Sequence, residues 1–319
     1  LFSRMTAQQR NQIPGRPSLP VRAVVDIGAT AIRMAVAEFP PSGGYRLVDA
    51  LQQSISIGRD TFTTGQISFE TTEACVEVLR NFLAAGRQYG IEAGRIRAVA
   101  TSAVREASNR DQFVDRVFIA TGIEVEPVEG AEVNRLTFLA VQPLFNRMPE
   151  LRKNNLLLIE VGGGNTEILG FCDGQANFAQ THRLGAFRIR EMLEEYSEPT
   201  LKLEDLLDRE ITGSVRSIRE GLVPGKPIQF LILGSEGRFA ASKINRKWDR
   251  REPARVTTAK IAKVAEGVLR HSVEEILRIY NLPFTEAETL GPALLAQVQL
   301  ARELDVQRIY IGTETLRDG

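Results

Sequence analysis

The chain has 319 residues, of which 43% are hydrophobic and 25% are charged, and these proportions are ordinary for a folded globular protein. This length is enough for two domains of roughly 100–200 residues each. Because 40 basic residues balance 40 acidic ones, net charge attracts the chain neither to nucleic acid nor to an anionic membrane, and neither is expected as a partner.

The first predicted element is a flexible tail over residues 1–20, where prolines and a glycine stand among Gln, Arg and Ser. Residues 22–28 and 32–39 are rich in strand-forming side chains and predict a hairpin, followed by a further strand over 45–57. The elements expected after them are a helix capped by Ser68, a strand over 96–100, a helix from about Ala103, a strand over 123–127 and a helix over 131–145.

The opening pattern recurs in the middle of the chain. Residues 156–161 predict a strand that includes the acidic Glu160, a run of glycines follows at 162–164, and a second strand reaches Gly170. A third glycine turn follows the strand over 230–233. Strands alternate with helices throughout, which predicts the α/β class. The recurrence indicates two similar domains rather than one large domain.

The expected domain organisation follows from this recurrence. The first domain is predicted over residues 21–145 and the second over 146–302, with the polar residues 146–155 leading from one to the other. The C-terminal segment 303–319 is expected to pack back on the first domain.

The cysteines and histidines have no metal-ligand spacing. Cys75 and Cys172 are expected to be reduced thiols, which indicates a cytoplasmic location. His182 and His271 are expected to be structural. The sequence contains no run of about 18 apolar residues that could span a membrane.

Each glycine turn can present backbone N–H groups to an anion, because glycine lets the backbone approach without a Cβ in the way. The acids Asp26 and Glu160 each precede a turn glycine by two residues. They are placed to hold a divalent cation or to orient water against bound phosphate. One such turn is a weak indication, since tight hairpins use glycine for their geometry. Two copies with an acid at the same offset are harder to explain by turns alone.

Further segments extend this pattern along the chain. In order, they are Asp26-Ile27-Gly28 with Ile32-Arg33, Gly65–Ser68, Ala98–Asn109, Gly162–Glu167, Leu184–Arg188 and Leu316–Gly319. The paired hairpins resemble the phosphate loops of the superfamily that contains actin, heat-shock ATPases and sugar kinases. The whole set resembles the exopolyphosphatase / guanosine pentaphosphate phosphohydrolase (Ppx/GppA) family. This resemblance implies two ribonuclease-H-like, actin-like ATPase domains with a cleft between them.

Members of this family remove terminal phosphate from inorganic polyphosphate or guanosine pentaphosphate with a magnesium ion and a water nucleophile. The resemblance implies that Asp26 and Glu160 hold Mg²⁺ or another divalent cation, and that Glu132 or Glu167 acts on the attacking water. The implied phosphate-binding residues are Gly28, Ala29, Thr30, Arg33, Arg105, Gly162, Gly163, Gly164, Asn165 and Thr166.

Two of the polar features have a second interpretation. The planar fork of Arg105 suits a phosphate oxygen, and the alternative is a surface ion pair with Glu106. The basic cluster 245–252, which includes Trp248, could extend a groove for a long polyanion. A solvated loop anchored by an amphipathic tryptophan is an equal alternative.

The sequence departs from the family pattern at the general base. The family has the second Glu of a Gly-x-Glu-Glu-Ala-Arg-Leu segment where this chain has Val133, which cannot accept a proton. Glu132 lies about 100° away around the helix, and Glu129 is also near. Loss of a general base costs about 10²–10⁴-fold in rate. Other departures are Ala29-Thr30-Ala31 for Ser-Asn-Ser, Glu160 for Asp, and Glu236 with Arg238 for Gly and Thr in the third turn.

Two functions therefore stay open. The first is a phosphohydrolase of polyphosphate or guanosine pentaphosphate, favoured by Arg105 and the intact Gly162–Glu167 segment. The second is a non-catalytic sensor of polyphosphate or an alarmone nucleotide, favoured by Val133 and the altered first turn. The enzyme is preferred. A sugar or acetate kinase is a third, less favoured class, and the choice between a monomer and a homodimer is open.

Overall fold

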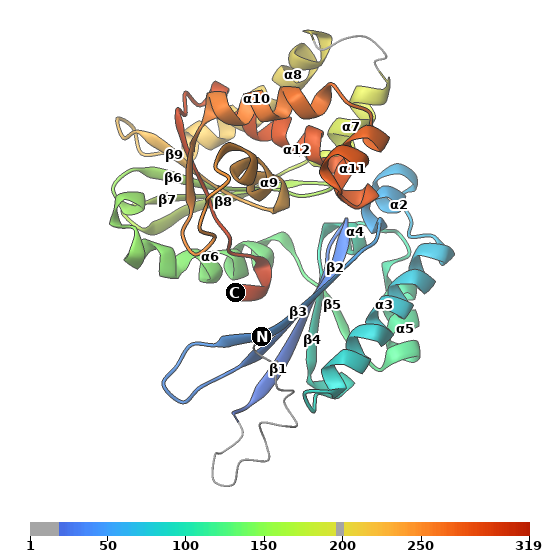
Figure 1. The fold of residues 1–319 in the computed structure, drawn as a ribbon. Helices are drawn as coiled ribbons and strands as arrows, with labels where there is room; N and C mark the ends of the chain where they lie inside the picture. The colour runs from blue at the N-terminus through green and yellow to red at the C-terminus, as the bar shows by residue number, and fades with distance from the viewer. Residues whose placement is uncertain (1–18, 196–200) are drawn as a thin grey trace. The chain divides into compact units, whose positions relative to one another are not determined.

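The computed structural model describes residues 19–195 and 201–319, so most of the predicted flexible tail lies outside the described residues. The chain divides into two compact units, Leu1–Val128 and Glu129–Gly319. Figure 1 shows the first in blue to green and the second in green to red. Among the described helices, none combines the length and the apolar character that a membrane span requires.

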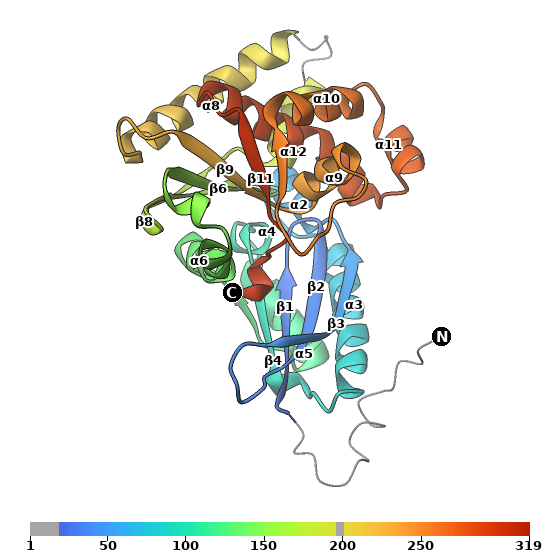
Figure 2. The same ribbon diagram turned by 60° about the vertical axis from the view of Figure 1, so that its left-hand side comes forward.

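The first unit is built on a five-stranded sheet in the order β3-β2-β1-β4-β5. Antiparallel pairing joins β1, β2 and β3, whereas β4 and β5 continue the sheet in parallel with β1. Figures 1 and 2 show α3 and α5 side by side on one face of this sheet. The elements are β1 (Val21–Ile27), β2 (Ala31–Glu38), β3 (Arg46–Ser54), α2 (Ile57–Thr64), α3 (Phe69–Arg87), η1 (Ala93–Arg95), β4 (Ile96–Ala100), α4 (Ser102–Arg105), α5 (Arg110–Thr121) and β5 (Val125–Pro127).

The second unit is built on a six-stranded sheet in the order β10-β11-β9-β6-β7-β8. Its strands are β6 (Asn155–Val161), β7 (Thr166–Cys172), β8 (Gln175–His182), β9 (Ile228–Leu233), β10 (Ala254–Thr257) and β11 (Arg308–Ile311). Its helices are α6 (Gly130–Arg147), η2 (Pro149–Arg152), α7 (Ala186–Glu195), α8 (Leu201–Gly221), α9 (Ser235–Ile244), α10 (Thr258–Leu269), α11 (Val273–Tyr280), α12 (Phe284–Glu303) and η3 (Leu316–Asp318).

Helices cover both faces of the second sheet. On one face, Val141 and Leu144 of α6 pack against Leu158 and Leu169 of the sheet. On the other face, α10 and α12 bury a larger apolar cluster that includes Ile159 of β6. Figures 1 and 2 show α6 on the side of the sheet opposite α10 and α12. Because both faces are buried, β6 is apolar at nearly every position, as expected for a central strand.

The two sheets share one connectivity. In each, three antiparallel strands joined by hairpins lead the chain, and parallel strands are then added beside the first of the three. The order β3-β2-β1-β4-β5 thus corresponds to β8-β7-β6-β9-β11, with β10 added at the edge. The predicted α/β class with two ribonuclease-H-like domains is confirmed.

The division of the chain differs from the sequence expectation at two segments. Residues 131–145 were expected in the first domain, but α6 belongs to the second unit because its apolar face is buried on the second sheet. The segment 303–319 was expected to pack on the first domain. In the structure, β11 of this segment pairs with β9 and β10, and Gly319 lies against Leu136 of α6.

Candidate functional site

The two glycine turns close in the same way. In the first, the Gly28 N–H donates to the Ala31 carbonyl at 3.0 Å, and in the second the Gly162 N–H donates to the Asn165 carbonyl at 2.8 Å. Both glycines directly follow the strand that carries the acid, β1 or β6. The recurrence seen in the sequence is therefore a recurrence of backbone geometry.

Residues 55–58 hold the first turn by backbone hydrogen bonds. The carbonyls of Ala29 and Thr30 accept hydrogen bonds from the N–H groups of Gly58 and Ile55, at 2.9 and 3.0 Å. In the part of the chain that the structure describes, the N–H groups of Ala29 and Thr30 make no backbone hydrogen bond. The carbonyls of this turn therefore bond to the protein, whereas its two amides have no backbone acceptor among the described residues.

The start of α7 holds the second turn in the same way. The carbonyls of Gly162 and Gly163 accept from the N–H groups of Ala186 and Phe187, both at 2.9 Å. The Gly164 carbonyl accepts from Nε of Arg188 at 2.9 Å. Over residues 19–195 and 201–319, the amides of Gly163 and Gly164 donate no backbone hydrogen bond.

Gly185 lets the second turn approach α7 this closely. A Cβ at Gly185 would lie 2.2 Å from the carbonyl carbon of Gly164 and 2.3 Å from the carbonyl oxygen of Gly163. Beside it, the buried Thr166 hydroxyl donates to the carbonyl of Leu184. Sequence reasoning did not include Gly185 and Arg188 among the site residues. Their signal was the Leu184–Arg188 segment, which contributed only to the family resemblance.

The acids before the two turns have different cross-strand neighbours. Asp26 lies opposite Arg33, whose Nη1 is 3.7 Å from Oδ2 of Asp26, and Nε of Arg33 donates to Gln52 at 3.3 Å. Glu160 lies opposite Glu167. Like charges at directly opposed positions of an antiparallel pair are destabilising. The second hairpin therefore concentrates negative charge, whereas the first pairs its acid with a cation.

This charge arrangement fits a divalent cation. Carboxylate oxygens are the ligands that Mg²⁺ prefers, and the ion usually keeps several waters or phosphate oxygens. The described residues contain no group of three or more His, Cys, Asp or Glu side chains that could hold a metal. A carboxylate donor such as Glu160 suits an ion that takes its remaining ligands from water and substrate. The Thr181 hydroxyl donates to Oε2 of Glu167 at 2.6 Å and so fixes this carboxylate.

Arg105 ends α4 and is largely buried. Its Nη1 donates to the carbonyl of Val128 at 2.8 Å, and Nη2 lies 4.0 Å from Glu106. The N–H of Thr101, at the start of the same turn, donates to the carbonyl of Ile27 at 3.2 Å. Arg105 thus lies near the end of β1 that leads into the first glycine turn, and it is engaged by the protein backbone.

Glu132, one of the two predicted catalytic acids, is held by a neighbour on α6. Arg135 donates to both of its carboxylate oxygens, from Nε at 2.7 Å and from Nη2 at 2.8 Å. This hydrogen bonding raises the pKa of Arg135. Val133, at the family's base position, is buried. Both carboxylate oxygens of Glu132 are therefore occupied by Arg135.

The third turn and the basic cluster 245–252 are poorly suited to bind an anion. At Gly234, which has φ of 107°, a Cβ would lie 3.1 Å from Oε2 of Glu236, so a carboxylate covers this turn. In the cluster 245–252, Trp248 packs on the core and its Nε1 donates to the carbonyl of Glu252 at 2.8 Å. The tryptophan anchors the loop, and the exposed side chains around it face solvent.

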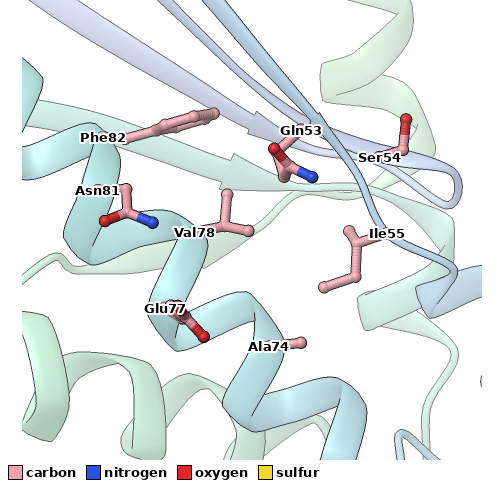
Figure 3. Close-up of a pocket in the computed structure, with 8 residues that line it drawn as sticks. All are labelled: Gln53, Ser54, Ile55, Ala74, Glu77, Val78, Asn81 and Phe82. Carbon is pink, nitrogen blue, oxygen red and sulfur yellow. The ribbon is translucent and has the colours of Figure 1, made fainter.

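The structure also has a hollow of about 380 Å³ in the first unit, between the end of β3 and α3. Figure 3 shows Glu77 and Asn81 of α3 on one side and Gln53 of β3 on the other. The residues that line it are Gln53, Ser54, Ile55, Ala74, Glu77, Val78, Asn81 and Phe82. They include one carboxylate and no cationic side chain, so the hollow does not suit a polyphosphate.

The chain is similar to known proteins. A family model described as the Ppx/GppA phosphatase family matches residues 40–319. Exopolyphosphatase 1 of Mycobacterium tuberculosis is 25% identical over 309 residues, which cover 93% of this chain and 86% of that protein. Exopolyphosphatase 1 of Mycobacterium leprae is 27% identical over 208 residues, which cover 64% of this chain and 59% of that protein.

Solved structures show the same fold. An exopolyphosphatase from Cytophaga hutchinsonii superposes with a TM-score of 0.80 at 16% identity, covering 94% of this chain and 96% of that one. The Aquifex aeolicus member of the Ppx/GppA family superposes with a TM-score of 0.73 at 19% identity, also covering 94% and 96%. Because the family model spans the larger part of the sequence, the chain belongs to the Ppx/GppA phosphatase family.

Proposed function

We propose that the protein is a phosphohydrolase that releases terminal phosphate from inorganic polyphosphate or guanosine pentaphosphate. The observation that carries this proposal is the matched pair of turns closed by Gly28 and Gly162. In both turns the carbonyls accept hydrogen bonds from the protein, and amide N–H groups are left to donate to an anion. Proteins named exopolyphosphatase 1 are among the relatives of the chain, which supports the same substrate class.

In this proposal each turn binds phosphate through its backbone amides. Amide hydrogens directed at phosphate oxygens are effective in a water-poor site because they need little reorganisation. Arg33 and Arg105 add charged donors next to the first turn. The second turn is composed of glycines up to Asn165, so its backbone can approach the phosphate closely.

Mg²⁺ would be held by Asp26 and Glu160, with Glu167 opposite Glu160 in the ladder. When bound, the ion would neutralise charge on the phosphate oxygens. The protein's own part is to position the phosphate chain and to take the proton of the attacking water. We assign the proton to Glu167, because Glu132 is held by Arg135 and Val133 has no acceptor.

A second candidate function is a sensor that binds the same ligands without turnover. The buried Val133 at the family's base position favours it. Either function suits a cytoplasmic protein, which we propose because both cysteines are free thiols.

The test is release of phosphate from polyphosphate and from guanosine pentaphosphate by the purified chain with Mg²⁺. Glu167→Gln is expected to lower kcat by about 10²–10⁴-fold while inorganic triphosphate still binds in calorimetry. Glu70→Gln is the control, because Glu70 lies in the first turn of α3, outside the proposed site. Triphosphate binding with no phosphate release from wild type would support the sensor. If the wild-type protein neither binds triphosphate nor releases phosphate, both functions are rejected.

A further inference from the structure

Helix α6 carries a buried amide group that its surroundings do not satisfy. Asn134 is only 7% exposed, and its Oδ1 has no hydrogen-bond partner among the described residues. An unsatisfied buried acceptor costs about 1–3 kcal/mol, and such a group in a native protein calls for an explanation, for example a water or a ligand.

The first turn of α6 lies beside Glu167. A Cβ at Gly130, the first residue of the helix, would be 3.1 Å from Oγ1 of Thr181. The same hydroxyl donates to Oε2 of Glu167. Asn134 follows Gly130 by four residues, which is about one helical turn, and therefore lies on the same side of the helix one step further along.

The direction of the Asn134 side chain follows from the residues below it on the helix. Phe138 and Val141 pack into the cluster that includes Leu158 and Leu169 of the second sheet. Because residues at i, i+4 and i+7 share a helix face, Asn134 is directed to the same face of the sheet.

The two carboxylates of the second hairpin lie on that face of the sheet. Glu160 follows Leu158 by two residues on β6, and Glu167 precedes Leu169 by two residues on β7. Alternate residues of a strand share one face, so both carboxylates point to the side covered by α6. The buried Asn134 oxygen and the opposed pair of carboxylates are thus directed into one region, at the end of the sheet where the glycine turn lies.

We propose that Asn134 is a positioning residue for the attacking water of the phosphohydrolase. This inference rests on the proposed function and adds to it. Oδ1 accepts one hydrogen bond from the water, and Glu167 accepts the proton that the water loses. The water oxygen bonds to the terminal phosphorus, and the bond from that phosphorus to the bridging oxygen breaks, so that phosphate and a chain one unit shorter are released. An amide is neutral and cannot act as the base. In this proposal, therefore, Asn134 orients the water and Glu167 takes its proton, two tasks that a single acid at position 133 would perform.

The experiment compares two buried asparagines of opposite hydrogen-bonding state. Asn155 is 1% exposed, donates to the carbonyls of Val223 and Lys226, and accepts from the Val223 N–H. Asn155→Ala is expected to lower the melting temperature, because it leaves buried partners unpaired. Asn134→Ala removes an unpaired oxygen, so its melting temperature is expected to equal or exceed that of wild type. Its kcat is expected to fall about 10- to 100-fold, the size of a misplacement effect, with the affinity for inorganic triphosphate unchanged.

Asn134→Asp separates positioning from simple packing. It keeps the shape and the acceptor and adds a charge, so we expect it to retain turnover and to gain a new acidic limb in its pH–rate profile. A structural role would produce the reverse pattern, in which Asn134→Ala loses melting temperature as Asn155→Ala does and keeps kcat.

Failure of this inference differs from failure of the proposed function. If wild type and Asn134→Ala release phosphate from polyphosphate at equal rates, the enzyme stands and the role of Asn134 is refuted. If wild type binds triphosphate and releases no phosphate, both are refuted together.

Discussion

Substitution of Gly185 by alanine tests directly whether the second glycine turn binds phosphate. The new Cβ would lie 2.2 Å from the carbonyl carbon and 2.4 Å from the Cα of Gly164. Carbon atoms in contact sit about 3.5–4.0 Å apart, so the turn and the start of α7 have to separate by more than about 1 Å. The contact is with backbone on both sides, and no side-chain rotation can relieve it.

The expected magnitudes follow from what this separation breaks. The N–H groups of Ala186 and Phe187 lose their bonds to the carbonyls of Gly162 and Gly163, each worth about 0.5–1.5 kcal/mol, and overpacking costs about 1–3 kcal/mol. We expect unfolding by urea to show a loss of about 2–6 kcal/mol. Displacement of the amides by about 1 Å is expected to weaken binding of inorganic triphosphate about 10- to 100-fold.

Calorimetry with triphosphate and urea unfolding measure the two effects, and Gly267→Ala is the matched control. Gly267 lies inside α10, and a Cβ there would meet no atom within 4 Å. This control is expected to gain about 0.5–1 kcal/mol from helix propensity and to bind triphosphate as wild type does. A folded Gly185→Ala protein that binds triphosphate with wild-type affinity would contradict the assignment of phosphate binding to this turn.

Three further outcomes are expected. Val133→Glu should lower stability in urea unfolding by about 1–3 kcal/mol, because the site is buried, and should raise kcat for polyphosphate; an unchanged kcat would exclude a simple restoration of the base. Lys226 lies 2.8 Å from Asp173, and its hydrogen bond lowers the pKa of that carboxyl. The stabilisation that ionised Asp173 gains from Lys226 is fully present above the unfolded pKa of about 3.9 and is lost as pH falls through the lower folded pKa. The difference in unfolding free energy between wild type and Asp173→Asn, measured in urea, should therefore shrink from pH of about 6 to about 3. Arg190→Met should cost about 3–5 kcal/mol in thermal or urea unfolding, since Glu288, its ion-pair partner, is fully buried; a cost below about 1 kcal/mol would show that Glu288 has other sufficient partners.

The sequence was sufficient for the parts of the site that are local. Asp26 and Gly28, like Glu160 and Gly162, are separated by one residue, so strand, acid and turn can be read from a short window. The closing hydrogen bonds then follow from the hairpin itself. The same holds for Ser68, which caps α3 by accepting from the Thr71 N–H as expected.

The parts that the sequence did not predict depend on contacts between distant segments. Nothing near Gly163 shows that Phe187 will satisfy its carbonyl, because this partner depends on the return of the chain after β8. The four-residue strand β11 has little local signal, and its place between β9 and β10 is decided by pairing. Glu132 looked available as a base in the sequence, but its neighbour Arg135 takes both carboxylate oxygens.

If the second turn binds phosphate as proposed, its support by α7 makes phosphate affinity depend on residues far from the phosphate. Two residues beyond Arg188, which bonds the Gly164 carbonyl, Arg190 forms an ion pair with Glu288 on the buried helix α12. A substitution on α12 that lets α7 shift will therefore displace the amide donors of the second turn, although the substituted residue does not contact the ligand. Screens for variants with altered substrate affinity should recover positions on α12 as well as the glycines themselves, and such variants will retain every group that contacts the substrate.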